Sequence, residues 1–249
     1  MTLDWISQAI ETLRSLGLNY TFLTDVAERQ SFIKGLGISA LLCAVTIPGS
    51  LATGVLLAAM VTSGRRWVAL PARGFIEVTR NTPTLVQLYC AFLVLNMLIT
   101  QQLRDWGIGQ NPLTPFFWVV LVVSLHKGAF HAEALRAGID AVPATTLEAA
   151  RSLGFSQRQI LRDVQLPLAL RFALPSLVNN LVELVKGTAI ASAIAVGDVT
   201  YQSIMIWSQH DNVLELLLLI VLWFGLLTWL VSLTGRWLEQ HWRMPGYGT

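Results

Sequence analysis

The stretch of sequence that decides the fold is GLGISALLCAVTIPGSLATGVLLAAMVTSG, residues 35–64, which contains no charged side chain. The hydrocarbon core of a bilayer is about 30 Å thick and offers the backbone no hydrogen-bonding partner. A helix therefore needs roughly 20 mostly apolar residues to cross it. This stretch is long enough, so it predicts a transmembrane helix.

Four more segments meet the same criterion, and two of them carry ionisable side chains. The segments are 81–103, 116–136, 172–197 and 216–235. Lys127, His131 and Glu133 lie in the second of these, and Glu183 and Lys186 lie in the third. Charged side chains are costly inside a bilayer, so we expect them to face a cavity or a partner. The predicted fold is an all-α membrane protein with five transmembrane helices.

The composition agrees with this fold class. Of the 249 residues, 54% are hydrophobic and 13% are charged, and the mean hydropathy is +0.57, which excludes a disordered chain and argues against a water-soluble domain. The net charge of +2 is too small to indicate a nucleic acid partner. Cys43 and Cys90 both lie in apolar stretches, so they indicate neither a disulfide framework nor a metal site.

No motif indicates catalysis or a bound cofactor. The sequence has no G-x-x-x-x-G-K-[ST] loop, so we expect this chain not to hydrolyse ATP alone. Its four histidines lack the spacing of metal ligands, and no Ser-His-Asp arrangement is supported. Asp4 and Glu11 stand where a signal peptide would carry basic residues, so no signal peptide is expected before the first span.

The distribution of Lys and Arg predicts the orientation of the spans. With the N-terminus outside, the inside segments hold 11 of the 17 basic residues and the outside segments hold four. Cytoplasmic loops are enriched in Lys and Arg, so we expect the N-terminus outside and the C-terminus in the cytoplasm.

We expect three regions along the chain. Residues 1–31 form an extracytoplasmic segment, 32–240 the transmembrane domain with a cytoplasmic loop at 137–167, and 241–249 a cytoplasmic tail. Apolar residues at helical spacing in the first segment indicate an amphipathic helix on the membrane surface, with a loosely ordered tail as the alternative. These residues are Trp5, Ile6, Ala9, Ile10, Leu13 and Leu16.

Two further features are expected at the membrane boundaries. Five tryptophans near the predicted span ends are interpreted as interfacial anchors. They are Trp67, Trp106, Trp118, Trp237 and Trp242. The segment 198–211 is expected to be polar and exposed on the outside.

The cytoplasmic loop contains two short helices whose ends are specified by the sequence. Pro143 ends the preceding helix, and Thr145 with Glu148 predicts a capping box at the start of the next. Gly154 supplies the residue that ends it. A second helix begins with another capping box, Ser156 with Gln159, and is expected to end at Pro167.

Such helices do not help a chain to cross lipid, so we expect another protein to use them. Ala149 and Ala150 leave a shallow face that a groove of another protein can approach, and Glu148 and Arg151 can fix the register at its rim. The alternative is a plain connecting loop.

Several motifs of this sequence, taken in order, carry a resemblance to one family. They are RNTPTLVQ at 80–87, GAFHAE at 128–133, LRAGI at 135–139, EAA at 148–150 followed by Gly154, Ile160 and Leu166-Pro167, and VKGTAI at 185–190. The EAA segment resembles the signature of the permease subunits of bacterial ABC importers. The other motifs are similar to those of the polar amino acid branch, which is related to histidine, glutamine, arginine and glutamate permeases.

The resemblance implies a type I ABC importer permease in the bacterial inner membrane that works by alternating access. Its partners would be a dimer of cytoplasmic ATPase subunits that bind ATP and Mg, a second permease subunit, identical or different, an extracytoplasmic amino-acid-binding protein and membrane lipid. The coupling helix of this family docks into the ATPase. The coupling residues are then Thr145, Glu148, Ala149, Ala150, Arg151, Gly154 and Pro167.

The same resemblance suggests a substrate path. Its candidate residues are Asn81, Thr82, Gln87, His126, Lys127, Glu183, Lys186 and Thr188. For Glu183 and Lys186, three residues apart on one helical face, mutual pairing is the alternative. For Asn81 and Thr82, a cap ahead of Pro83 is the alternative.

This sequence departs from the family pattern at positions that bear on the substrate. Gly187 stands where many members have an acidic residue, and Asn180 stands where many have Glu. Lys127 and Lys186 lie within spans. Together these residues favour an acidic or neutral polar amino acid over a cationic one.

Two other functions remain open from the residues alone. A secondary transporter would use the intramembrane Glu, Lys and His residues as an ion or proton relay. It is expected to show inverted repeats, which five spans do not supply. A membrane scaffold would leave the capped cytoplasmic helices without a use.

Overall fold

The computed structural model describes residues 10–12, 14–15, 17–107 and 111–242, and the regular secondary structure in these residues is helical. Four of the segments are not α-helical: η1 and η4 are 3-10 helices, and η2 and η3 are π-helical turns. In chain order the elements are η1 (Thr21–Leu23), α2 (Val26–Thr62), α3 (Arg66–Arg80), α4 (Thr84–Tyr89), η2 (Cys90–Leu95), α5 (Asn96–Asp105), α6 (Pro115–Asp140), α7 (Ala144–Ser152), α8 (Gln157–Gln159), η3 (Ile160–Gln165), α9 (Leu166–Gly187), η4 (Thr188–Ile194), α10 (Val199–Trp207) and α11 (Val213–His241).

Five described helical segments are long and apolar enough to cross a membrane, which confirms the predicted number of spans. They are Val26–Thr62, Thr84–Asp105, Pro115–Asp140, Gln157–Ile194 and Val213–His241. The first has 37 residues and measures about 55 Å at 1.5 Å per residue. It begins well before residue 35 because the Asp25 carboxylate caps it, accepting the backbone N–H groups of Ala27 at 2.8 Å and Glu28 at 3.0 Å.

The expectation that Pro167 ends a short helix is wrong. α8, η3 and α9 run on without a break into the fourth span. Within η3 the pattern is π-helical, and the N–H of Leu166 bonds to the carbonyl of Leu161, five residues earlier. Pro167 follows this π-helical turn, whose altered hydrogen-bond pattern accommodates a residue without an N–H donor.

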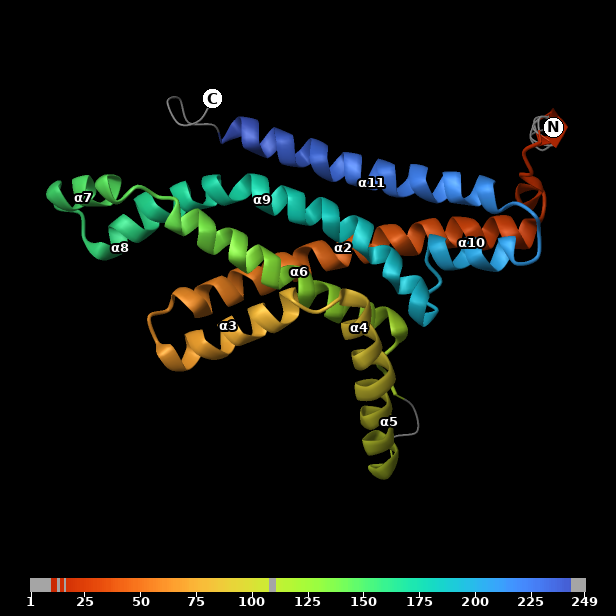
Figure 1. The fold of residues 1–249 in the computed structure, drawn as a ribbon, viewed down its shortest axis with the longest axis horizontal. Coiled ribbons are helices and arrows are strands. Elements are labelled where there is room, and N and C mark those ends of the chain that lie inside the picture. The colour runs from red at the N-terminus through yellow and green to blue at the C-terminus, as the bar shows by residue number, and fades with distance from the viewer. Residues whose placement is uncertain (1–9, 13, 16, 108–110, 243–249) are drawn as a thin grey trace.

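Close packing of small residues holds the central helices together. α6 lies between α2 and α9, and α11 packs on α9 (Figure 1). At Gly128 of α6 a methyl group would collide with Thr53 of α2. At Gly138, further along α6, a methyl group would collide with the backbone carbonyl of Ala169 in α9. Small residues allow helix backbones to approach closely, which is how helices associate in lipid.

The bundle has two ends, which we call the α7 end and the α10 end. α7 and the last turn of α11 lie at one end, and α10 and the first turns of α2 lie at the other (Figure 1). The predicted amphipathic helix falls mostly on residues outside the described part, although Ile10 is buried. The predicted tail at 241–249 likewise lies almost wholly outside it.

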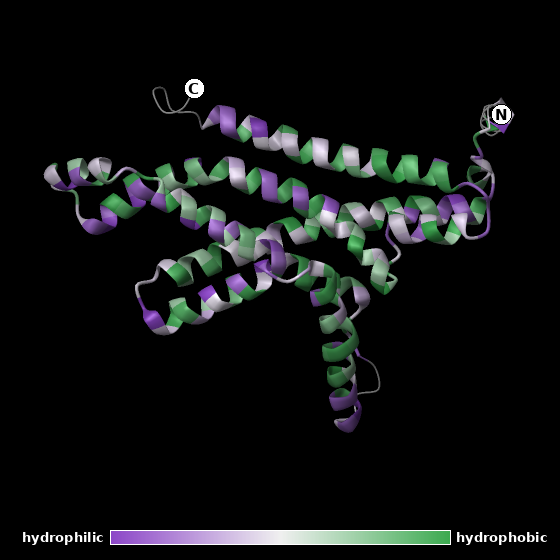
Figure 2. Cartoon of the chain, in the orientation of Figure 1, coloured by the Kyte–Doolittle hydropathy of each residue, from purple (hydrophilic) through white to green (hydrophobic). Residues whose placement is uncertain are grey.

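The second span stands away from the bundle. α4, η2 and α5 form one rod that projects to the side of α6 (Figure 1), and its surface is largely apolar (Figure 2). Its far half is fastened to α6 through Asn96, whose side-chain oxygen accepts the indole N–H of Trp118 at 3.0 Å and the amide of Asn111 at 2.8 Å. Trp118 is only 3% exposed, so the prediction that it is an interfacial anchor is wrong. Trp67 and Trp106 are exposed, as anchors require.

The segment 198–211 is exposed as expected at residues 208–211, whereas most of its first part is buried or half-buried. Its first half forms α10, which packs along the start of α2. The backbone N–H of Val199 donates to the Ser39 hydroxyl at 3.0 Å. Asp198 caps α10 and is almost completely buried, and this burial raises the pKa of its carboxyl group to about 6.

Candidate functional site

α7 is the first of two candidate sites, and it begins two residues earlier than predicted. Pro143, with an extended ψ of 132°, occupies the N-cap position, and no side chain caps the helix. Thr145 therefore lies in the first turn of α7, and the capping box predicted for Thr145 and Glu148 is wrong. The fixed φ of Pro143 supplies the start of the helix instead.

The other end of α7 is built as predicted. Gly154 has a φ of +81°, in the left-handed region. Its N–H bonds to the carbonyl of Arg151 at 2.9 Å, and the N–H of Phe155 bonds to the carbonyl of Ala150 at 3.2 Å. This pair of bonds is the Schellman motif that closes a helix with glycine. The capping box of Ser156 that starts α8 is also confirmed.

The surface of α7 is partly apolar and has no cover within the described chain. Ala150 is buried against the protein itself, whereas Ala149 is exposed. Leu153 is 78% exposed and Phe155 is 41% exposed. We call Ala149, Leu153 and Phe155 the α7 tip patch. Leu153 and Phe155 were not among the coupling residues expected from the sequence, although both stand next to Gly154 at the end of α7.

The second candidate site is a polar cluster on α6, inside the bundle. His126 is buried, and its Nε2 lies 2.8 Å from the Thr84 hydroxyl while its Nδ1 lies 3.2 Å from the Gln87 side-chain oxygen. The Gln87 amide donates to the carbonyl of Thr79 at 2.9 Å and to the Thr82 hydroxyl. The structure thus brings together Gln87, His126 and Thr82, three of the candidate path residues, and Thr84 joins them.

The alternative reading of Asn81 and Thr82 as a cap for the following helix is wrong. Both side chains donate backwards, Asn81 to the carbonyl of Glu77 at 2.7 Å and Thr82 to that of Val78 at 2.9 Å. They therefore close α3, and Pro83 stands before α4 without a side-chain cap.

The structure pairs the charged residues of the spans differently from the expectation. Lys127 of α6 lies 3.2 Å from the carboxylate of Glu183 in α9, so the predicted Glu183–Lys186 pair is wrong. Lys186 is exposed and forms no ion pair with a described residue. Thr188 is buried on another side, where its hydroxyl lies 3.6 Å from the sulfur of Cys43. Lys186 and Thr188 are therefore separate from the cluster around His126.

Ionic and aromatic contacts continue along α6 toward the α7 end. The Phe130 ring is flanked by two cations, the Arg80 guanidinium 5.3 Å and the Lys127 ammonium 5.1 Å from its centroid. The next turn carries Glu133, which lies 4.0 Å from Arg80 and also pairs with Arg136. α6 thus presents a row of polar contacts from the Lys127–Glu183 pair to its last turn.

This arrangement offers no ligand set for a metal. In the part of the chain that the structure describes, no three His, Cys, Asp or Glu side chains are grouped so that they could hold an ion.

Residues 50–244 match the family model of the binding-protein-dependent transport system inner membrane component. The chain belongs to this family. It is the permease subunit of an ABC transporter for polar amino acids, an inner membrane protein whose ATPase is a separate subunit. This membership decides against the secondary transporter and the scaffold, and it implies a substrate-binding protein as a partner.

Relatives and one solved structure support the same assignment. The glutamate transport system permease protein of Corynebacterium efficiens is 38% identical over 170 residues, which cover 67% of this chain and 73% of the relative. The octopine transport system permease protein of Rhizobium meliloti is 36% identical over 149 residues, 58% of each chain. The crystal structure of an amino acid ABC transporter with histidines contains a chain that is 31% identical, with a TM-score of 0.73 over 88% of this chain and 98% of that one.

Proposed function

We propose that this chain imports an acidic or neutral polar amino acid by alternating access, with α7 as the contact through which the ATPase drives it. The observation that carries the proposal is α7 itself. It is a helix with both ends defined, it projects from the bundle, and its tip patch is apolar and uncovered within the described chain. In this proposal the N-terminus is outside and the α7 end faces the cytoplasm.

The coupling residues have distinct tasks in the proposal. Ala149, with Leu153 and Phe155, enters a groove of the ATPase, and the exposed Glu148 and Arg151 flank it. The remaining residues maintain the shape of the loop. Thr145 lies in the first turn of α7, Ala150 packs inward, Gly154 closes α7, and Pro167 lies where η3 enters α9.

The projecting rod of α4 and α5 is proposed to meet the second permease subunit. Apolar side chains cover its exposed surface, among them Leu93, Val94, Met97 and Leu98. A span with so little contact to its own bundle is better packed when another subunit lies beside it. The second subunit is either a copy of this chain or a different permease.

The charges within the spans support the proposed substrate class. Lys127 is neutralised by Glu183, whereas Lys186 is left without an ion pair among the described residues. The net charge of these three side chains is therefore +1. The relative named for glutamate transport agrees with an acidic substrate. Gln87, His126 and Thr82 would supply hydrogen bonds to the substrate, and Asn81 closes α3 beside them. Thr188 is buried beside Cys43, separate from this cluster.

The orientation can be tested by labelling single cysteines. Cys43 and Cys90 are first replaced by serine, and cysteine is then introduced at Ser152 in α7 or at Ser208 after α10, both of which are exposed. A membrane-impermeant maleimide should label position 208 in intact spheroplasts and position 152 only after permeabilisation. Labelling of position 152 from outside would refute the proposed role of α7.

The substrate class is tested by uptake into proteoliposomes that contain the permease, its ATPase and its binding protein. Glutamate and glutamine should compete for uptake more strongly than arginine. If arginine competes best, the proposed substrate class is wrong, although the importer assignment remains.

A further inference from the structure

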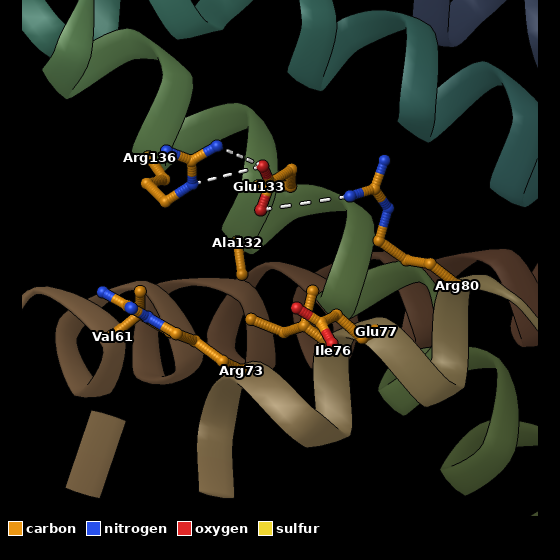
Figure 3. A pocket seen from close by; sticks show the side chains of 8 residues that line it. All are labelled: Val61, Arg73, Ile76, Glu77, Arg80, Ala132, Glu133 and Arg136. Atoms are coloured by element: carbon orange, nitrogen blue, oxygen red, sulfur yellow. Dashed lines mark hydrogen bonds and ion pairs between the residues drawn. The ribbon is translucent and has the colours of Figure 1, made fainter. Parts of the chain in front are cut away.

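A cavity of about 350 Å³ lies between α3 and α6, separate from the cluster around His126. α3 contributes Arg73, Glu77 and Arg80, and α6 contributes Glu133 and Arg136 (Figure 3). Its remaining wall is apolar. Five charged side chains around one small cavity in a membrane protein call for a function.

The cavity lies along the half of α6 that leads to α7, beside the end of α2, and not at the tip of the bundle. α3 follows the turn that ends α2 and runs back beside it (Figure 1). At 1.5 Å per residue, Arg80 is about 21 Å from Arg66 along this direction. Five of the eight lining residues carry a charge, and charged groups are costly to bury without water or a partner. We therefore expect the cavity to hold water.

Two of the five charged side chains form no ion pair with a described residue. The Glu133 carboxylate is shared by Arg80 and Arg136. Arg73 and Glu77 are one helical turn apart, and neither forms an ion pair with a described residue. One cation and one anion are therefore available on the same wall of the cavity.

We propose that this cavity is a second amino acid site, through which the substrate leaves toward the ATPase side. Arg73 binds the α-carboxylate and Glu77 binds the α-ammonium group. The apolar wall of Val61, Ile76 and Ala132 accommodates the carbon chain. The inference rests on the proposed function, because it assumes that the α7 end is the side of release.

One cation and one anion on the same wall favour a zwitterionic ligand. An inorganic anion would leave Glu77 unmatched, and a simple cation would leave Arg73 unmatched. An amino acid satisfies both groups at once, with charge-assisted hydrogen bonds that are stronger than neutral ones.

Occupancy of this site from the ATPase side has a measurable consequence. A ligand that binds one state of a transporter shifts the population toward that state. An amino acid held between α3 and α6 at high internal concentration therefore favours the releasing state. Substrate on the ATPase side should then slow ATP hydrolysis.

The test uses the complete transporter in proteoliposomes with the ATPase facing outward. Uptake assays first identify which of glutamate, glutamine, arginine and histidine is carried. ATP hydrolysis is then measured while that amino acid is raised on the ATPase side to about 10 mM, roughly ten times the upper range of ordinary KM values. The wild type should be inhibited. R73Q and E77Q should each raise the half-inhibitory concentration at least tenfold while the uptake KM changes less than twofold.

A matched variant and two analogues keep the test independent of folding defects. Arg66 is an exposed arginine of α3 outside the cavity, so R66Q should be inhibited like the wild type. ATP hydrolysis by the wild-type transporter is also measured with two analogues of the transported amino acid. One lacks the α-ammonium group, and the other has an amide in place of the α-carboxylate. Each should inhibit at least tenfold more weakly than the amino acid itself.

The outcomes separate the two proposals. Uptake without any inhibition from the ATPase side, or equal inhibition of R73Q, E77Q and R66Q, overturns the second site and leaves the proposed function standing. Failure to transport any of the four amino acids overturns both.

Discussion

Replacing Gly154 by valine tests the role of α7 most directly. Gly154 has a φ of +81°, and a side chain built there would meet no atom within 4 Å. The substitution therefore adds backbone strain without a steric clash. A β-branched residue in the left-handed region costs on the order of 1–2 kcal/mol.

This strain falls on the closing bonds of α7. If residue 154 leaves the left-handed region, the N–H groups of residues 154 and 155 lose their carbonyl partners in α7. A cost of 1–2 kcal/mol corresponds to roughly a 5- to 30-fold smaller population of the closed helix. The apparent Kd of a partner that binds only this form rises by up to the same factor.

The assay measures the Kd of the ATPase subunit for the purified permease and the number of amino acids imported per ATP hydrolysed. G154V should weaken binding, by up to about 5- to 30-fold, and lower the number of amino acids imported per ATP. G154N should stay near the wild type because asparagine tolerates the left-handed region. Gly64, in the turn after α2, has a φ of +70° and equally free space, so G64V carries the same strain away from α7. Equal affinity and coupling in G154V, G64V and the wild type would refute the docking role.

Three further predictions concern the bundle. G138V should reduce the yield of folded permease in detergent, measured by size-exclusion chromatography, because its side chain collides with the Ala169 carbonyl between α6 and α9. K127A should lower the unfolding temperature by leaving the Glu183 carboxylate unpaired, and the double variant with E183A should recover much of the loss; additive losses would contradict the pairing. Asp198 has its pKa raised to about 6, so the folded state holds a proton that the unfolded state releases. Its contribution to stability is thus present below about pH 4 and lost as the pH rises through about 6, and D198N should lack this part of the pH dependence of the unfolding temperature.

The sequence predicted the features whose cause is local. A span requires a long apolar stretch, and all five were found for that reason. Gly154 and the capping box of Ser156 depend on neighbouring residues only, and both are confirmed. The cap at Thr145 was wrong because the preceding Pro143 already supplies the N-cap conformation.

The predictions are wrong where the structure depends on an unusual backbone geometry or on a contact between residues far apart in the sequence. Pro167 does not end its helix because a π-helical turn precedes it, and no residue pattern announces such a turn. Lys127 pairs with Glu183, 56 residues away, whereas a sequence pattern indicates only neighbours on one helix such as Lys186. Motifs therefore name candidate path residues, but they do not indicate the partners of those residues.

The same two helices connect both candidate sites, which gives the coupling a mechanical basis. α6 leads into α7 through the turn at Pro143, and α9 is reached from α7 through the continuous helix of α8 and η3. The two helices touch without a gap at Gly138, and further along they carry Lys127 and Glu183, which bridge them. A force on α7 therefore acts on α6 and α9 together. Packed helices move as rigid bodies and shift between discrete arrangements, so a small displacement at the tip can open or close the space beside the Lys127–Glu183 pair. In the proposed function, this pair is the point at which motion of the ATPase reaches the substrate path.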